Sequence, residues 1–416
     1  MESSHGDVLD RFLRYVRVYT TSQEDVQEIP STPRQFDLAR LLVQELNDMG
    51  MDSVELDDHC IIYGTLATNL PEETAARVPI VCFIAHLDTS PEEPGENVQP
   101  LVVTYTGGDL TYPNNPDLAV TVEDSPVLSD LEGEMLVTSD GTTLLGADDK
   151  AGVAEIMAAV SFLLQHPDIP HGTIKIVFSP DEEVNHSVDF IDVQKIGADF
   201  GYTLDGDELG TIEAECFNAV SGNIVIQGYN VHPGYAYGKM VNAARVMADI
   251  LKLFPDEIAP ETTRDREGYY HPAHVQGSVN EAKMDFLLRD FDQGALQEKI
   301  EAIRTGVAEV QAKYPGAKIN LEFKEGYHNM KEIMDQHPRV TEIADEAIRR
   351  LSVEPRHKEI RGGTDGARLC FMGLPCPNLF AGGMNFHSKK EFVPVRWMEQ
   401  AVQMILNIVE ITSKEA

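Results

Sequence analysis

Hydrophobic and polar positions along the chain follow two patterns that alternate. Short continuous apolar runs, which are typical of buried strands, are separated in several places by segments with apolar positions at helical spacing, of which residues 150–165 are the clearest. Apolar strands that alternate with helices indicate an α/β sheet covered by helices on both faces. The predicted buried strands lie at 78–86, 173–179, 200–205 and 376–383.

Residues 212–327 follow a different order. Their pattern predicts a strand, a helix, a pair of strands with a turn, a long helix and a last strand, which is the β-α-β-β-α-β order of a split-βαβ, ferredoxin-like domain. The pattern of the larger unit resumes afterwards, and 416 residues are too many for one ordinary core. We therefore expect a smaller α+β domain at 212–327, inserted into a discontinuous larger domain formed by 1–211 and 328–416.

Two helices are expected before the first strands. The segment from Met1 to Ser22 lacks the basic-then-apolar order of a signal peptide and has the pattern of an amphipathic helix. A second helix is expected to start at Ser31 or Thr32, which are common N-caps, and to end at Gly50. The longest apolar run, PIVCFIA, is far too short to span a bilayer.

Composition and charge restrict the compartment and the partners. The five cysteines form no C-x-x-C pair and lie mostly in apolar runs, which favours reduced thiols in a cytoplasmic protein. With 33 basic and 69 acidic residues the net charge is −36, which argues against nucleic acids and anionic membrane surfaces as partners. The acidic excess fits either plain solubility or adaptation to high internal salt.

Acidic and imidazole side chains follow the predicted buried strands at the point where each strand ends. In open α/β sheets such positions gather at one edge, beyond the carboxyl ends of the strands. The last strand leads to a further histidine, and an acidic pair precedes the helix at 150–165. The residues concerned are His86, Asp88, Asp148, Asp149, Asp181, Glu182, Glu183, Asp205 and His387.

This convergence of carboxylates predicts a metal site, because buried charges without partners are costly. Histidine with aspartate and glutamate, and without cysteine, suits zinc, with manganese or cobalt as substitutes. The set holds more carboxylates than one tetrahedral zinc accepts, so two ions that share an activated water fit better than one. In the doublet Glu182–Glu183, one residue can be a ligand and the other a general base.

Each residue also has an ordinary interpretation. His86 alone is more often a surface residue, Asp148 a helix cap and Asp205 a turn residue. These interpretations become unattractive when all of them must hold at successive strand ends. The sequence contains no H-E-x-x-H, G-x-S-x-G, P-loop or G-x-G-x-x-G motif, so zincins, hydrolases with a nucleophile elbow and nucleotide-binding proteins lack support.

Several motifs carry a resemblance that covers nearly the whole chain. They are FIAHLDTSP, LLGADDKAGVAEIM, FSPDEEV, YTLDG, NVHPG, IRGGTDGA, MGLPCPNLF and FHSKKEF. Together they resemble the tripeptide aminopeptidases, a subgroup of the co-catalytic zinc peptidases, a family that also holds carboxypeptidases and deacylases. The resemblance implies a catalytic domain with a central mixed sheet flanked by helices. One departure is that Asn185 and His186 follow PDEEV where the subgroup usually has glycine.

The resemblance implies a ligand set for two Zn²⁺ ions, with Mn²⁺ or Co²⁺ as substitutes. His86 and Asp205 would hold one ion, Glu183 and His387 would hold the other, and Asp148 would bridge both.

The resemblance also implies supporting roles. Glu182 would be the general base, and Asp88 would orient His86 from behind. The peptide bond between Asp148 and Asp149 is often cis in this family, and Lys150 would form a supporting ion pair.

The inserted domain resembles the lid of this family, which also carries the contact of a homodimer. His232 in NVHPG would then reach a neighbouring active site and stabilise the oxyanion, although without the resemblance an ordinary turn histidine before proline would be the preferred interpretation. Arg289 and Arg361 would bind the backbone or carboxylate of the peptide. For Arg289 an arginine on a strand surface is the alternative.

The predicted activity is that of a metallo-aminopeptidase that releases the N-terminal residue from short peptides, chiefly tripeptides. A dipeptidase, carboxypeptidase or N-acyl amino-acid deacylase on the same metals is the alternative, because the ligands do not separate these enzymes. A catalytically silent metal-binding protein is a third interpretation, and the doublet Glu182–Glu183 argues against it.

Overall fold

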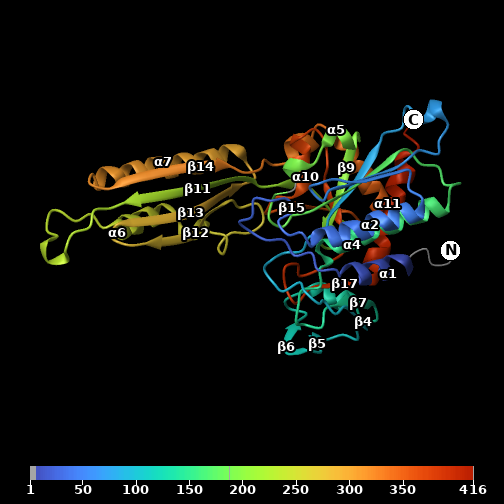
Figure 1. Cartoon of the computed structure of the whole chain (residues 1–416), viewed down its shortest axis with the longest axis horizontal. Coiled ribbons are helices and arrows are strands. Elements are labelled where there is room, and N and C mark those ends of the chain that lie inside the picture. The colour runs from blue at the N-terminus through green and yellow to red at the C-terminus, as the bar shows by residue number, and fades with distance from the viewer. Residues whose placement is uncertain (1–5, 187, 416) are drawn as a thin grey trace. The chain divides into compact units, whose positions relative to one another are not determined.

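The structure is a computed structural model that describes residues 6–186 and 188–415. The chain divides into two compact units, which we call the first and the second unit (Figure 1). The second unit comprises Glu215–Lys331 and Glu359–Gly363, and the first unit comprises the remaining described residues.

The short segment Glu359–Gly363 belongs to the second unit, although the sequence pattern placed it in the larger domain. Glu359 pairs with Arg266 at 2.9 Å, and Arg361 donates to the backbone carbonyls of Asp265 and Glu267. These contacts link residues that lie far apart in the chain, so periodicity alone does not show them.

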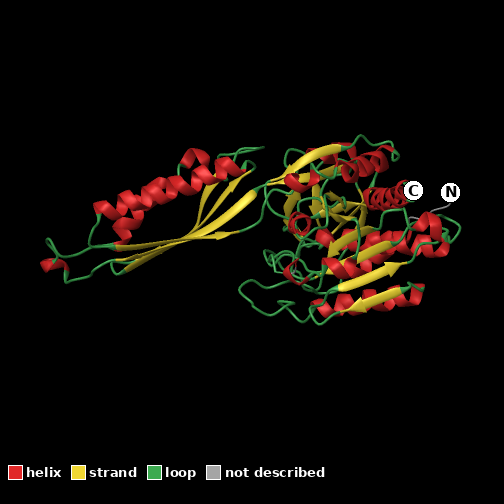
Figure 2. Cartoon of the chain, turned by 90° about the horizontal axis from the view of Figure 1, so that it is seen from above, coloured by secondary structure: helices red, strands yellow, loops and turns green. Residues whose placement is uncertain are grey.

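The largest sheet consists of the strands β1 (Ser53–Leu56), β2 (Ile62–Leu66), β3 (Val81–His86), β8 (Ile174–Ser179), β9 (Phe200–Gly206), β10 (Thr211–Cys216), β15 (Arg356–Ile360) and β16 (Asn378–Phe380). Its strand order is β1-β2-β8-β3-β9-β16-β10-β15. β3 is parallel to β8 and β9, and β16 is parallel to β9, whereas β1, β2 and β10 have antiparallel partners. The predicted mixed sheet flanked by helices is therefore confirmed (Figure 2).

The helices that accompany this sheet are α1 (Gly6–Tyr15), α2 (Gln35–Met49), α3 (Glu72–Ala75), α4 (Ala147–Gln165), α5 (Val193–Ile196), α8 (Lys331–Met334), α9 (Pro338–Arg349), α10 (Asp365–Phe371) and α11 (Val395–Thr412). α4 packs on β3 and β9, and α1 and α11 pack against α4. Gly152 permits the close approach of α4 to β9, because a Cβ atom there would lie 2.0 Å from the Leu204 carbonyl oxygen.

The start of α4 differs from the expected regular helix. Asp148 and Asp149 lie within its assigned range, yet both have non-helical backbone angles. The peptide bond between them is cis, as the resemblance implied. The regular helix therefore begins only after the acidic pair, close to the expected start at Lys150.

The start of α2 was predicted wrongly. Its N-cap is Arg34, which makes no side-chain cap hydrogen bond. Ser31 does not cap the helix: its hydroxyl oxygen accepts the backbone N–H of Gln23 at 2.9 Å, and its hydroxyl donates to the distant carboxylate of Asp181. The end of the helix was predicted correctly, since Gly50 closes it with a φ of 85°.

Two small sheets belong to the first unit. β4 (Leu101–Thr104), β7 (Met135–Thr138) and β17 (Phe392–Pro394) form one, and β5 (Leu110–Tyr112) and β6 (Asn115–Val120) form the other. Their apolar side chains build a separate core cluster that includes Tyr112, Phe392 and Trp397. β17 follows His387 in the chain, so this cluster anchors the segment that carries His387.

The second unit contains β11 (Asn218–Gln227), α6 (Ala243–Ile250), β12 (Tyr269–Gly277), β13 (Glu281–Asp290), α7 (Gln293–Lys313) and β14 (Lys318–Glu325). Its sheet has the order β12-β13-β11-β14, and neighbouring strands are antiparallel. The helices pack on the sheet around a core that includes Met284, Phe286 and Ile303. This is the expected split-βαβ arrangement.

Three remaining expectations concern the chain as a whole. The N-terminal helix is present as α1, and its expected portion over residues 1–5 lies outside the described residues. No disulfide joins the five cysteines, all of which are described and buried. None of the described helices combines the length and apolar composition that a membrane crossing requires.

Candidate metal centre

Polar residues from three strands meet at one edge of the large sheet. His86 is the last residue of β3, Asp205 lies near the end of β9, and Glu182 and Glu183 follow the end of β8. Because β3, β8 and β9 are parallel, their carboxyl ends lie at the same edge. The connection after β16 adds His387, and the start of α4 adds Asp148.

The carboxylate of Asp148 lies between two histidines. Its Oδ1 atom is 2.8 Å from Nε2 of His86, and its Oδ2 atom is 3.2 Å from Nε2 of His387. Each carboxylate oxygen thus faces a different imidazole. This is the arrangement expected of a carboxylate that bridges two cations.

Two more acids extend this arrangement into a continuous row. Oδ1 of Asp205 lies 3.6 Å from Nε2 of His86, and Oε2 of Glu183 lies 2.8 Å from Nε2 of His387. The row therefore runs Asp205, His86, Asp148, His387, Glu183, and Asp148 is its middle member. Two imidazoles and three carboxylates in this order form a donor set that fits a pair of divalent cations.

Asp88 supports both the histidine and the acidic loop. Its carboxylate lies 3.3 Å from Nδ1 of His86, on the side of the ring away from the row. The same carboxylate accepts hydrogen bonds from the backbone N–H groups of Glu182 at 3.0 Å and Glu183 at 3.3 Å. Asp88 is fully buried, so it fixes the orientation of the His86 ring together with the position of the acidic doublet.

The acids of the row are crowded. Burial, followed by the charge of Asp148, raises the pKa of Glu183 to about 8 and the pKa of Asp205 to about 7. Hydrogen bonds with Asp148 and Glu183 raise the pKa of His387 to about 12. Near neutral pH the carboxylates therefore depend on nearby positive charge to ionise together, and divalent cations would supply it.

The family is decided by comparison with known proteins. The model of peptidase family M20/M25/M40 matches residues 140–411 of the chain. The chain belongs to this peptidase family. The prediction of a hydrolase of the co-catalytic peptidase family is thereby confirmed.

Individual members of the peptidase family extend the match over the whole chain. The chain is 46% identical to the Peptidase T of Caldanaerobacter subterraneus subsp. tengcongensis over 409 aligned residues. The alignment covers 98% of this chain and 99% of that protein. The chain is 44% identical over 409 residues to the Peptidase T of Parabacteroides distasonis, which covers 98% and 100%. The crystal structure of aminopeptidase PepT from Bacillus cereus has the same fold, with a TM-score of 0.76, 21% identity and 99% coverage of each chain.

Asp149 was expected among the converging acids, but without a ligand role of its own, although it stands beside the predicted bridge. Its carboxylate accepts hydrogen bonds from the backbone N–H of His86 at 3.1 Å and of Gly152 at 3.2 Å. It thereby joins the end of β3 to the first turn of α4. The acidic doublet itself was the available signal, but it does not show which member faces the histidines.

A second unpredicted contact fixes the loop before the acidic doublet. The carboxylate of Asp181 accepts hydrogen bonds from the backbone N–H of Ser31 at 2.5 Å and from Nε2 of Gln35 at 2.6 Å. Oε1 of Gln35 accepts the backbone N–H of Asp181 at 3.1 Å in return. These bonds hold Asp181 at a φ of 55°, immediately before Glu182. No local pattern relates residues 31–35 to residue 181.

Lys150 does not form the expected ion pair with any described residue. Its Nζ atom donates instead to the backbone carbonyl of Val18 at 2.8 Å. Burial lowers the pKa of Lys150 to about 7. A backbone carbonyl is a suitable partner here because it satisfies a donor without adding another charge to the interior.

The three predicted substrate-binding residues lie in the second unit. His232 is exposed, and its Nδ1 atom accepts the backbone N–H of Gly234 at 3.1 Å. Arg361 uses its guanidinium within the fold, because it donates to the carbonyl oxygens of Asp265 at 2.8 Å and Glu267 at 3.0 Å. Arg289 stacks over the ring of Tyr327 at 4.8 Å, and its Nε and Nη1 atoms are buried without a hydrogen-bond partner among the described residues.

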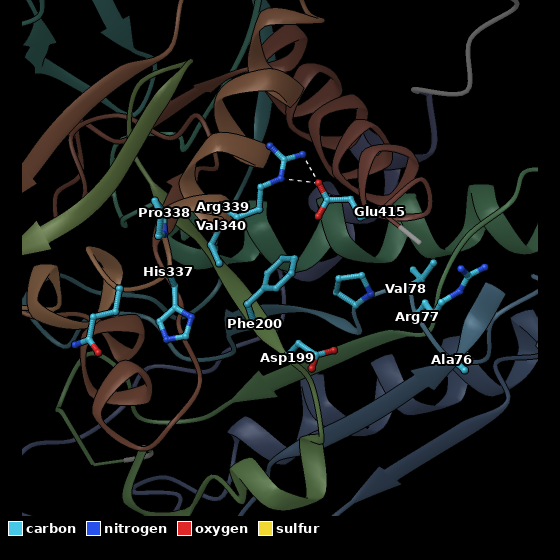
Figure 3. A pocket seen from close by; sticks show the side chains of 12 residues that line it. Ala76, Arg77, Val78, Asp199, Phe200, His337, Pro338, Arg339, Val340 and Glu415 are labelled. Carbon is cyan, nitrogen blue, oxygen red and sulfur yellow. Dashed lines mark hydrogen bonds and ion pairs between the residues drawn. The ribbon is translucent and has the colours of Figure 1, made fainter. Parts of the chain in front are cut away.

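A cavity of about 620 Å³ lies at the opposite edge of the large sheet (Figure 3). Its lining includes Val78, which precedes β3, and Phe200, which begins β9, so it adjoins the amino ends of the strands. Arg339 and Glu415 form an ion pair at its wall. The other two charged residues of the lining bind backbone groups, since Arg77 donates to the carbonyl of Glu73 and Asp199 accepts the backbone N–H of Ile80. The described lining contains no row of acids and imidazoles.

Replacing Asp148 by alanine is expected to abolish metal retention, because both halves of the row then lose their shared oxygen donor. Metal content per chain after exhaustive dialysis measures this loss. The matched control is Asp207→Ala, since Asp207 lies two residues beyond Asp205 but pairs with Lys358 at 2.5 Å instead of joining the row. Metal content equal to that of the unmodified protein in Asp148→Ala would contradict the assignment.

Proposed function

We propose that this M20/M25/M40 peptidase is a metal-dependent aminopeptidase that releases the N-terminal residue from short peptides, chiefly tripeptides. The observation that carries the proposal is the position of the Asp148 carboxylate. One of its oxygens faces His86, and the other faces His387. The name Peptidase T of the full-length relatives supports the choice of substrate.

Two Zn²⁺ ions per chain are proposed as the native metals, with Mn²⁺ or Co²⁺ as substitutes. His86 and Asp205 would hold one ion, Glu183 and His387 the other, and Asp148 both. Bound metal ions would supply Lewis acidity toward the peptide carbonyl and lower the pKa of water.

Glu182 is proposed as the general base. Its backbone N–H is tied to Asp88, which fixes the residue beside the ligand Glu183. Burial and the neighbouring carboxylate of Asp365 raise the pKa of Glu182 well above its usual value. A carboxylate with raised proton affinity is suited to take a proton from water and to hand it to the leaving amine.

Arg289 is proposed to bind the C-terminal carboxylate of the peptide. Its buried Nε and Nη1 atoms are donors that the described residues do not use. A guanidinium that lies over the Tyr327 ring at 4.8 Å has a packing partner that limits its motion, and bidentate binding of a carboxylate requires donors in a fixed direction. The guanidinium of Arg361 already binds backbone carbonyls, so Arg289 is the stronger candidate of the two.

A homodimer formed through the second unit is also proposed. His232 is exposed and lies on the same loop as Tyr229, Tyr235 and Tyr237, whose exposed fractions are 58%, 74% and 100%. Exposed aromatic side chains that gather on one loop are typical of a surface that a partner covers. His232 would then act at the active site of the second copy. We further propose that the enzyme is cytoplasmic.

The first test is a substrate panel with the purified enzyme. We expect tripeptides with a free N-terminus to be hydrolysed faster than dipeptides, longer peptides and N-acylated peptides, and activity to disappear on chelation and return with Zn²⁺. Faster cleavage of acylated substrates would favour a deacylase, and release of the C-terminal residue would favour a carboxypeptidase. Bound metal without any hydrolysis would favour the silent metal-binding protein.

Glu182→Gln is expected to retain metal and to lower kcat by about 10²- to 10⁴-fold, because the amide cannot accept the proton of the water. Steady-state kinetics together with metal content check this expectation. Glu93→Gln is a matched control, since Glu93 pairs with Lys389 at 3.3 Å and is not part of the row. A turnover close to that of the unmodified enzyme would remove Glu182 from the mechanism.

Arg289→Met is expected to raise KM for a tripeptide by about 10- to 100-fold, the loss that a charge-assisted hydrogen bond typically causes. KM for the same tripeptide with a C-terminal amide should change little. Arg304→Met is the control, because Arg304 stacks over Phe323 at 4.7 Å in the same unit. An equal effect of Arg289→Met on both substrates would show that Arg289 does not read the carboxylate.

A further inference from the structure

A buried glutamate of the motif FHSKKEF, to which the sequence analysis assigned no role, lies behind the row. Glu391 stands immediately before β17 and is 1% exposed. Its Oε2 atom accepts the backbone N–H groups of Leu145 and Gly146, both at 2.7 Å. Its Oε1 atom accepts the backbone N–H of Asp148 at 3.1 Å. One carboxylate therefore binds three backbone donors within four residues around the start of α4.

These donors have no regular partners of their own. Gly146, the N-cap of α4, has a φ of 82° and supplies no side-chain cap. Asp148 has non-helical backbone angles, and the first turn is irregular. The N–H groups at the beginning of a helix must be satisfied from outside, and a buried carboxylate suits them because of its negative charge. Glu391 supplies from a distant segment what a local capping residue would otherwise supply.

The segment that contains Glu391 also carries His387. Met384 and Phe392 close this segment at its base, because each donates its backbone N–H to the other's carbonyl, at 2.8 and 3.1 Å. The backbone N–H of Glu391 donates to the carbonyl oxygen of Ser388 at 3.3 Å. The His387 ring is thus fixed relative to Glu391 through a short closed loop, and Glu391 is fixed directly to the backbone of Asp148.

We propose that Glu391 is a positioning residue that sets the distance between the Asp148 carboxylate and His387, and thereby the affinity of the metal pair. The inference rests on the proposed function, because it assumes that Asp148, His387 and Glu183 hold one of the two proposed metal ions. Glu391 touches neither substrate nor metal. It acts through the backbone of Asp148 on one side and through the loop of His387 on the other.

The test compares Glu391→Gln with the unmodified enzyme. An amide can offer only one acceptor oxygen, and its NH₂ group would face a backbone N–H. We expect the affinity for Zn²⁺, measured by competition with a chromogenic chelator, to fall by about 10- to 100-fold, as is usual for residues that orient metal ligands. We also expect kcat at limiting zinc to fall, excess zinc to restore most of it, and KM to stay nearly unchanged. A purely structural role would not produce rescue by zinc.

Lys390→Gln is the matched control, because Lys390 is the neighbouring residue and pairs with Asp124 at 3.5 Å on the surface. Zinc affinity within about twofold of the unmodified enzyme in Glu391→Gln, or an equal loss in Lys390→Gln, would overturn the proposal. If Glu391→Gln does not fold, Glu391→Asp decides. Its shorter side chain keeps the charge but cannot reach all three N–H groups, so unchanged zinc affinity would overturn the proposal.

Two further outcomes separate the possible failures. If neither variant folds, Glu391 serves the fold as a whole and the proposal is wrong. If the unmodified protein itself binds no zinc and cleaves no tripeptide, the proposed function fails. If the unmodified protein does both and the variants match it, only the role of Glu391 fails.

Discussion

The structure depends on one carboxylate that faces two imidazoles. Asp148 can present one oxygen to His86 and the other to His387 only if the end of β3, the start of α4 and the loop before β17 are held in place together. Such precision is demanding because the three segments are far apart in the chain and all carry charge. In the irregular first turn of α4, Asp149 binds the backbone N–H of His86, and the backbone N–H of Asp148 binds Glu391 before β17, so this turn contacts both other segments.

The acids near the row divide into two classes by their hydrogen-bond partners. Asp88, Asp149, Asp181 and Glu391 accept backbone N–H groups, and each joins two segments of chain. The acids of the row face imidazoles instead, and Oε1 of Glu183 is buried without a partner among the described residues. Backbone N–H groups give the first class hydrogen-bond partners within the fold, whereas the acids of the row have imidazoles as their partners. The partners of these carboxylates therefore separate the acids that join segments of chain from the acids that form the row.

The same criterion separates the arginines of the second unit. Arg361 donates to backbone carbonyls and joins the segment 359–363 to the loop at 263–267. Arg289 lies against Tyr327 with two buried donors that no described residue accepts. Both were candidate peptide-binding residues when only their motifs were known, and for Arg289 an arginine on a strand surface was the alternative. A cation whose donors remain available is the one that fits an anionic end of a substrate.

The sequence by itself determined the fold class and pointed to the acids and imidazoles that the fold brings together in the row. Buried strands and helices have local periodicities, and residues such as His86 and Asp205 stand at strand ends, where parallel topology brings them to one edge. Only the tertiary structure decided how the acids are used. Serine is a residue type that commonly caps helices, but the hydroxyl of Ser31 donates to Asp181. Glutamate is usually a surface residue, but the carboxylate of Glu391 accepts the backbone N–H of Asp148 at the start of α4. Those contacts join segments that are remote in the chain, and no periodicity or local motif encodes them.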